Sequence, residues 1–467
     1  MKKYFLIIIS LIMFSINSLA QNDTLSNIYQ ISLNQAIEIG YKNNLTIKNS
    51  RLEIRKAKWK IWETTAIGLP QVNGQVQFQD FLEIPTQLMP NFLLPVVFNV
   101  NTNYFGLRPI QQPNFGNNKI AVQFGSQYNT SLGLTVSQLI FNGEYIVGLK
   151  ASKTFKALSE QNYLKTQLEI KNGIEKGYMM CLITEQLEKV LQENYQNINK
   201  LLKQTQELVN EKMAEQTKVD QIKIIQLTIE NQLNTVKRQK QLAYMMLKFQ
   251  LGLNLTDSLI LTDSLENFLE NSNINAKILT DFSPEQNINY KIALTREKLA
   301  LLDMRRAEAK FLPSITGIFN YSTKEMSDDF DIFDKNANWY KSSMIGISVA
   351  IPIFGSGQKI AIRQQKRIAL EEAHNTTEML RKQLNIQYEQ AKNKYLDAYG
   401  KYINTKQNLA LSKKIYQDTE IKFKNGTASS FELTQAENQL LQKQAAYYQA
   451  IMELLNTKFD LLKLVNQ

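Results

Sequence analysis

The chain has 467 residues, with one cysteine, one histidine and a formal net charge of +11 at pH 7. A single cysteine excludes a disulfide framework. Neither Cys181 nor His374 sits in a constellation typical of nucleophilic catalysis or metal binding, so we expect no enzyme and no cofactor. The basic residues are scattered along helical patterns rather than gathered in a nucleic-acid-binding motif, which favours solvated helix faces.

Residues 1–20 have the pattern of a secretory signal peptide. Lys2 and Lys3 precede the almost wholly apolar run 4–16, and Ser18-Leu19-Ala20 offers small residues at the positions that a signal peptidase reads. The apolar run is short for a membrane-spanning helix. We therefore expect cleavage after Ala20, with a retained membrane anchor as the alternative.

Two parts of the chain, 21–283 and 284–467, repeat one order of elements. In each, a helical pattern ends at a Leu-Pro pair, at Pro70 and at Pro313, because proline cannot continue the helical hydrogen-bond ladder. A strand, a loop, a second strand, a glycine-containing break and a long helical hairpin follow in both, which predicts two structural repeats. The predicted parts are β-hairpins at about 71–141 and 313–353, helical hairpins at about 144–250 and 358–465, and a connecting segment at about 251–283.

The first predicted strand alternates strictly between two faces. Val72, Val76 and Phe78 share one face, and the other face carries five amides: Gln71, Asn73, Gln75, Gln77 and Gln79. The last predicted strand, 343–353, alternates in the same way, with isoleucine or valine at every second position. This period predicts one face in an apolar medium and one in water. About ten residues are enough to cross an outer membrane at a tilt.

Four such strands are too few to close a membrane barrel, because about eight strands is the smallest number that works. Open strand edges are also not tolerated in lipid. If the strands span a membrane, several chains must share one barrel, and three copies of four strands give twelve. A soluble sheet packed on a core is the alternative, but the neighbouring helices lack the broad apolar stripe that would cover it.

The segment at about 81–128, between the first two strands, is much longer than its counterpart in the second repeat. Its prolines exclude a membrane helix, and it is rich in aromatic residues and nearly free of charge. We expect a structured extracellular loop, with a disordered loop as the alternative.

Each long helix carries a narrow stripe of regularly spaced residues along one face, called its seam below. From Tyr388 to Phe423, large and small residues alternate at spacings of three and four, and a similar seam runs from Leu433 to Leu461 with Lys443 as the misfit. This is the 3.5-residue period of a coiled coil. One continuous helix over 358–424 would be about 100 Å long at 1.5 Å per residue. The pattern predicts helices lying side by side in a wall, with a long coiled coil without a channel as the alternative.

Glycine marks both places where a strand leads into a long helix, at Asn142-Gly143 and at Gly355-Ser356-Gly357. We expect these glycines to supply the unusual backbone angles of a strand-to-helix junction. At the far end of the second helical hairpin, Asn425-Gly426 is predicted to end one helix.

The helix that follows this far turn carries its own start signal. Ser429 and Glu432 have the spacing of a capping box. In the first repeat, Gln216-Thr217 takes the place of Gly426-Thr427. We expect the two turns to form the tip of the molecule.

These features, in this order and doubled, resemble the TolC-like outer membrane efflux family over nearly the whole mature chain. The resemblance is carried by "LPQV" from Leu69, "PIFGSG" from Pro352 and "KNGTASSFELTQAENQL" from Lys424. It implies a mainly α, tandem-repeat TolC-like fold with a small membrane β part. Four strands per chain would contribute to a homotrimeric twelve-stranded barrel in the outer membrane of a Gram-negative bacterium, and a long α-helical barrel would reach into the periplasm.

The resemblance also implies a function and partners. The chain would be the passive exit duct of a tripartite efflux or type I secretion system that passes small molecules, ions or proteins outward. Its partners would be a periplasmic adaptor protein, an inner-membrane pump of the RND, ABC or MFS type, and outer membrane lipid, with no nucleic acid. A periplasmic coiled-coil scaffold or adaptor without a channel is the alternative.

The family closes its periplasmic tip with a network that includes acidic residues after the Gly-Thr turn. Carried over to this sequence, Glu432 keeps a carboxylate at the aperture and Gln435 does not, which implies one acidic ring rather than two. Plain helix capping is the alternative role for Glu432. The residues implied in adaptor docking are those of the two turns: Glu215, Gln216, Thr217, Asn425, Gly426 and Thr427.

Overall fold

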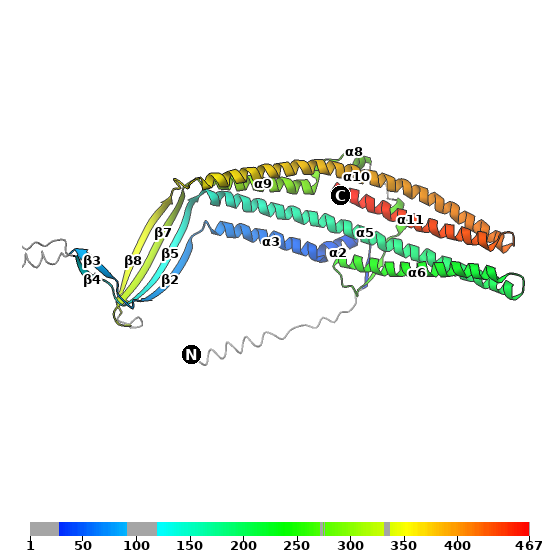
Figure 1. Cartoon of the computed structure of the whole chain (residues 1–467), viewed down its shortest axis with the longest axis horizontal. Helices are drawn as coiled ribbons and strands as arrows, with labels where there is room; N and C mark the ends of the chain where they lie inside the picture. The colour runs from blue at the N-terminus through cyan, green and yellow to red at the C-terminus, as the bar shows by residue number, and fades with distance from the viewer. Residues whose placement is uncertain (1–27, 91–118, 271–273, 275, 331–336, 467) are drawn as a thin grey trace, which may run out of the picture. The chain divides into compact units, whose positions relative to one another are not determined.

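The structure, a computed structural model, describes residues 28–90, 119–270, 274, 276–330 and 337–466. The predicted signal peptide and most of the predicted loop at 81–128 lie outside the described residues. Figure 1 shows the elements in chain order. They are β1 (Ile28–Ile31), α2 (Leu33–Asn43), α3 (Leu45–Ala66), β2 (Gln71–Asp80), β3 (Thr86–Pro90), β4 (Lys119–Gln123), β5 (Tyr128–Asn142), α5 (Gly143–Asn210), α6 (Gln216–Leu251), β6 (Ser258–Leu261), α7 (Leu265–Glu270), α8 (Ala276–Thr280), the 3₁₀ turn Pro284–Gln286, α9 (Ile288–Ala309), β7 (Ser314–Ser327), β8 (Trp339–Ala350), α10 (Gln358–Lys424) and α11 (Ser430–Leu464).

The chain forms two compact units. One consists of Met1–Ala57, Lys156–Glu297 and Glu372–Gln467, and the other of Lys58–Phe155 and Lys298–Glu371. Each unit draws on both predicted repeats, so compactness does not follow the repeat boundary. The division into tandem repeats therefore stays a proposal, which the doubled order of helix, strand pair and helical hairpin supports.

The sheet of the second unit has the strand order β2-β5-β7-β8, and every neighbouring pair is antiparallel. Each of the four strands overlaps a predicted one, but β8 ends at Ala350, so Ile351 and Ile353 of the predicted strand 343–353 lie outside it. A bulge between Leu139 and Phe141 interrupts the β5–β7 register. The two further strand pairs in the described part of the chain are small: β1 with β6, which are parallel, and β3 with β4, which are antiparallel.

The narrow seam of α10 is confirmed in the first unit. Tyr388, Tyr395, Ala398 and Tyr402 are buried, whereas most of the helix surface between them is exposed. The α11 seam is confirmed as well, from Leu433 to Leu461. However, α11 also buries Leu441, Ile451, Leu455 and Phe459, because it packs against α6 as well as carrying its seam. Its buried stripe is therefore wider than the sequence predicted.

The connecting segment packs on the seam tyrosines of α10. The Tyr388 hydroxyl donates to the Ile278 carbonyl at 2.9 Å, and its ring stacks on Phe282 with 4.5 Å between centroids. The Ile274 amide donates to the Tyr395 hydroxyl at 3.2 Å. A tyrosine buries its ring and still offers a polar tip, so these seam positions pair the backbone of an irregular segment that would otherwise lack partners.

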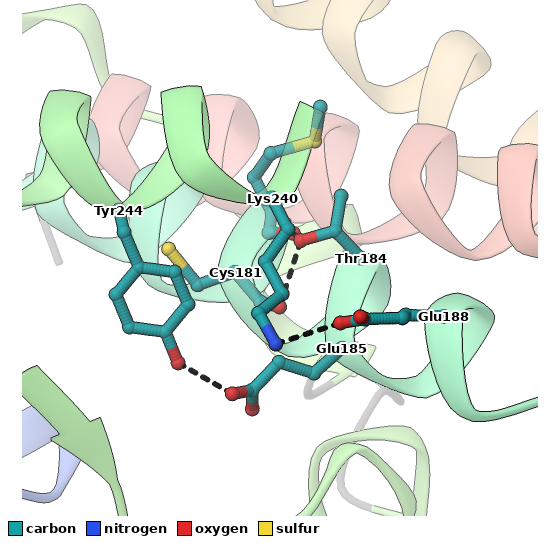
Figure 2. A network of polar contacts seen from close by, with 7 residues as sticks. Cys181, Thr184, Glu185, Glu188, Lys240 and Tyr244 are labelled. Atoms are coloured by element: carbon teal, nitrogen blue, oxygen red, sulfur yellow. Dashed lines mark hydrogen bonds and ion pairs between the residues drawn. The ribbon is translucent and has the colours of Figure 1, made fainter. Parts of the chain in front are cut away.

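Polar pairs fix α5 against α6 in the same unit (Figure 2). The Tyr244 hydroxyl donates to Glu185 at 2.7 Å, and Lys240 pairs with Glu188 at 2.7 Å. Both acids lie on α5, one turn apart, and both partners lie on α6. Contacts at this spacing fix the register of two antiparallel helices.

Candidate functional sites: the four-stranded sheet and the helical turns

The four-stranded sheet has one apolar and one polar face. Its register places Val72, Val136, Phe319 and Ile345 side by side in one row across all four strands. The adjacent row, on the opposite face, is Asn73, Thr135, Asn320 and Met344. The alternation is therefore in phase across all four strands in these two rows, whereas the row of Val76 and Leu132 continues into Thr323 and Lys341.

The apolar face is exposed to the surroundings of the chain. Val76 is 77% exposed and Ile345 is 85% exposed, and Val72 and Ile347 are similar. A soluble sheet would bury such a face under helices, so the alternative of a sheet packed on a core is wrong. None of the described helices has the length and apolar character that a membrane-spanning helix requires.

Both outer strands of this sheet have an open edge. In the described part of the chain, β2 pairs only with β5, and β8 pairs only with β7. An open edge presents unpaired backbone N–H and C=O groups, which need water or another strand. The sheet therefore combines an exposed apolar face with two open edges.

The junction between α3 and β2 depends on residues that the sequence analysis did not select. The Gly68 carbonyl accepts a hydrogen bond from Gln138 at 2.5 Å, and the Tyr145 hydroxyl donates to the Thr65 carbonyl at 3.2 Å. A Cβ on Gly68 would lie 2.4 Å from the Tyr145 hydroxyl oxygen, so any larger residue there would have to displace the Tyr145 side chain. Gln138 breaks the apolar alternation of β5, and that break was the signal for its role. Pro70 follows this helix end, as predicted.

The β5–α5 junction needs glycine for space rather than for backbone angle. Gly143 does not have a positive φ. A Cβ there would lie 2.9 Å from a methyl of Leu312 and 3.1 Å from the Cβ of Ala309. Asn142 caps α5, since its side-chain oxygen accepts from the Tyr145 amide at 2.9 Å, and its amide donates to Ser314 at 3.3 Å. The prediction of an unusual backbone angle is therefore wrong at Gly143.

The same prediction is confirmed at the β8–α10 junction. Gly357 has φ +80° and Ser356 has φ +47°. Gly355 has neither a positive φ nor a close neighbour, so the prediction is wrong at this position. Pro313 directly precedes β7, where α9 ends in a turn like that of α3: the Leu312 amide bonds to the Ala309 carbonyl as the Leu69 amide bonds to Ala66.

The two helical turns share one backbone geometry. Gly426 has φ +72° and its amide bonds to the Phe423 carbonyl, while the Thr427 amide bonds to Lys422. Lys212 has φ +61° and its amide bonds to Val209, while the Met213 amide bonds to Leu208. Lys212-Met213 is therefore the structural counterpart of Gly426-Thr427.

The match of Gln216-Thr217 to Gly426-Thr427 is correspondingly wrong by four residues. Gln216 begins α6, Glu215 is its N-cap without a side-chain hydrogen bond, and Thr217 lies in its first turn. Lysine at a left-handed position carries no local signature, which is why the turn could not be placed there from the sequence. In the corrected register, Lys218 is the counterpart of Glu432.

The capping box at the start of α11 is present. The Ser429 side chain accepts from the Glu432 amide at 3.2 Å, and the Glu432 carboxylate accepts from the Ser429 amide at 2.7 Å. The bond from the Ser429 amide, together with a second one that the carboxylate accepts from the Ser429 hydroxyl at 2.9 Å, holds the pKa of Glu432 below its usual range. Glu432 is thus an exposed, ionised carboxylate, and Gln435 is exposed one turn further on. Whether either residue acts at an aperture stays a proposal.

A buried carboxylate lies near this turn, and the sequence analysis missed it. Glu437 on α11 is 3% exposed, and the Tyr416 hydroxyl of α10 hydrogen-bonds to it. Burial raises its pKa to about 7, against the bond from Tyr416, and nearby Glu420 raises it further. Glu437 flanks the predicted seam and is buried because α11 has the wider stripe described above.

The sheet and the helical hairpins together make up a TolC-like fold. A family model described as outer membrane efflux protein matches residues 291–467. This match and the solved structures below confirm the resemblance to the TolC-like outer membrane efflux family that the sequence motifs indicated.

Three solved structures of this class show how much of the chain the likeness covers. CusC aligns with TM-score 0.71 and 15% identity over 96% of this chain and 95% of its own. VceC from Vibrio cholerae aligns with TM-score 0.68 and 14% identity over 93% of this chain and 96% of its own. The Campylobacter jejuni CmeC outer membrane channel aligns with TM-score 0.67 and 18% identity over 93% of this chain and 85% of its own. A search of curated protein sequences found no match.

Proposed function

We propose that the chain is the outer membrane channel of a tripartite efflux or type I secretion system and acts as a passive exit duct. The observation that carries this proposal is the sheet, whose apolar face is exposed between two open edges. Lipid is the medium that favours such a face, and neighbouring copies are the partners that such edges need. The TolC-like fold and the match to the efflux family support the same assignment.

Three chains then form one twelve-stranded barrel, in which β2 of one copy pairs with β8 of the next. A stripe on α3, the helix that leads into β2, supports this assembly. Leu45, Leu52 and Trp59 recur at intervals of seven residues and are 71%, 52% and 69% exposed. A heptad stripe suits a helix of a neighbouring copy. The stripe thus continues the proposed interface from the strand edge onto the helix.

The polar face of the sheet lines the lumen in this assembly, and the helical hairpins extend into the periplasm of a Gram-negative cell. β2 contributes only uncharged amides to that face over most of its length: Gln71, Asn73, Gln75, Gln77 and Gln79. Small molecules, ions or proteins are the cargo that such a duct passes.

A periplasmic adaptor protein and an inner-membrane pump of the RND, ABC or MFS type complete the system. We place adaptor docking at the two helical turns, around Asn425, Gly426 and Thr427 and around Glu215, Gln216 and Thr217. The corrected register adds Lys212 and Met213 to the first turn.

The aperture is placed at the start of the second helix of each hairpin. In three copies, Glu432 supplies three carboxylates there, and its counterpart Lys218 supplies three ammonium groups. Gln435 adds no charge. A mixed ring of both signs holds the tips together more readily than an acidic ring does, because unlike charges attract.

Two substitutions at neighbouring positions of β2 test the channel assignment. Val76→Lys places a charge on the proposed lipid face, at a cost of about 2–4 kcal/mol near the membrane midplane. Gln75→Lys places the same charge in the proposed lumen. We expect Val76→Lys to abolish trimer insertion into planar bilayers. Gln75→Lys should still conduct, with its reversal potential shifted toward anions.

Equal behaviour of the two variants would contradict the proposal. So would purification of the wild-type chain as a monomer without detergent, which is the behaviour expected of a periplasmic scaffold.

A further inference from the structure

A cavity of about 280 Å³ lies in the first unit, where α5, α6 and α11 come together. Four methionines line it: Met179 and Met180 on α5, Met246 on α6 and Met452 on α11. The chain has 13 methionines in all. Four of them thus converge from three helices on one cavity, although leucine or isoleucine would fill apolar space equally well.

Two glycines of α5 make room for this cavity. A Cβ on Gly173 would lie 3.3 Å from the Gln250 amide, and a Cβ on Gly177 would lie 3.6 Å from a Leu247 methyl. The absent side chains let α6 approach α5 closely. One to two turns further on, the Tyr244–Glu185 hydrogen bond and the Lys240–Glu188 ion pair join the same two helices (Figure 2). The cavity walls are therefore held by contacts outside the cavity.

The four methionines differ in burial. Met179 is 2% exposed and belongs to the main hydrophobic cluster, Met180 and Met452 pack on that cluster, and Met246 is 59% exposed. Met246 is therefore the methionine of the lining that is open to solvent.

The donor atoms in the lining select a particular class of ligand. The lining contains thioethers and the amides of Gln250 and Asn456, but no carboxylate, imidazole or thiol. Within the described residues, no group of three or more His, Cys, Asp or Glu is placed to hold a metal ion either. Neutral, soft sulfur donors suit Cu(I) and disfavour hard divalent cations. The single cationic residue in the lining, Lys176, is neutralised by Asp460 of α11 at 2.6 Å.

We propose that this methionine cavity binds one soft monovalent cation, Cu(I) or Ag(I), through thioethers contributed by all three helices. Met180, Met246 and Met452 supply one donor from each helix. Binding connects α5, α6 and α11, so it stabilises the folded chain by mass action. The site is independent of the proposed channel function, because it neither lines the polar sheet face nor lies at the helical turns.

The test measures silver binding to the full-length protein in chloride-free buffer by equilibrium dialysis. All variants carry Cys181→Ala, because a thiol competes with thioethers for soft metals; burial raises the pKa of this thiol to about 12. The test variant is Met180→Leu, Met246→Leu and Met452→Leu combined, which conserves side-chain volume. The matched control replaces three methionines outside the cavity: Met213, Met344 and Met379.

We expect one saturable silver ion per chain in the parent and in the control, and a rise in Tm on binding. The test variant should lose at least about tenfold in affinity and show no Tm rise. X-ray absorption at the silver edge should show sulfur ligands in the parent. If the test variant does not fold, Met246→Leu alone, at an exposed position, must show the loss.

Two outcomes overturn the proposal. One is unchanged silver binding by the test variant, and the other is the absence of saturable binding by the parent. Binding of an apolar probe at the cavity without silver binding falls under the second outcome and assigns the cavity to apolar ligands instead.

Discussion

The buried carboxylate of Glu437 makes the stability of the α10–α11 hairpin depend on pH. Its pKa is raised from 4.5 to about 7 in the folded chain. Between these two values the folded state binds more protons than the unfolded state, so stability falls as the pH rises. The stability that the chain has with Glu437 protonated is fully present below about pH 4.5 and is lost as the pH rises through about 7.

The size of the effect follows from the shift. One pH unit corresponds to 1.36 kcal/mol, so keeping Glu437 ionised and buried above pH 7 costs about 3 kcal/mol per chain. Glutamine has the same shape and no charge. Glu437→Gln should therefore raise the stability of the hairpin by up to about 3 kcal/mol at about pH 8, and by little at about pH 5.

The assay is thermal unfolding of the detergent-solubilised protein, followed by circular dichroism at both pH values. Glu432→Gln is the matched control on the same helix, because Glu432 is exposed and its pKa is lowered rather than raised. Its removal should not change the difference between the two pH values. An equal pH dependence of Tm in Glu437→Gln and in the wild type would refute the reasoning, and would mean that Glu437 is solvated in the assembled protein.

The junctions and turns give three further predictions. Gly143→Ala should destabilise the chain by about 1–3 kcal/mol, because the added Cβ would clash with Leu312 and Ala309. The control Gly148→Ala lies in the same helix with open space around it and should stabilise the chain by about 0.5–1 kcal/mol. Tm shifts of equal size and sign in the two variants would refute the role assigned to Gly143. Lys212→Gly should stabilise by up to about 1 kcal/mol, since it relieves a positive φ, and a lower Tm would count against the shared turn geometry. Ser429→Ala should cost about 0.5–2 kcal/mol through loss of the capping box, and hydrogen exchange at the start of α11 would then accelerate; unchanged exchange there contradicts the cap.

The sequence predicted those parts of the fold that local chemistry determines. The strands follow from a strict two-residue period, and the capping box follows from Ser429 and Glu432 at fixed spacing. The α10 seam follows from tyrosines spaced along one face, such as Tyr388 and Tyr402. In each case the residues that carry the signal are close together in the chain.

The features that sequence reasoning missed depend on what packs nearby. Gly143 is required by Leu312 and Ala309, which are far away in the sequence. Glu437 lies on a flank of α11 outside the seam and is buried there, next to Tyr416 of α10. Lys212 holds a left-handed backbone position with a residue that gives no sign of it. None of these could be found without the tertiary structure.

The shared geometry of the two helical turns has a consequence for recognition. The hydrogen bonds at Lys212 and Met213 match those at Gly426 and Thr427, although the side chains have nothing in common. Three assembled chains would present six loops of one contour, with alternating chemical character around the circle. A partner that touches all six must fit their common outline, whereas a partner that distinguishes neighbouring loops must rely on the side chains.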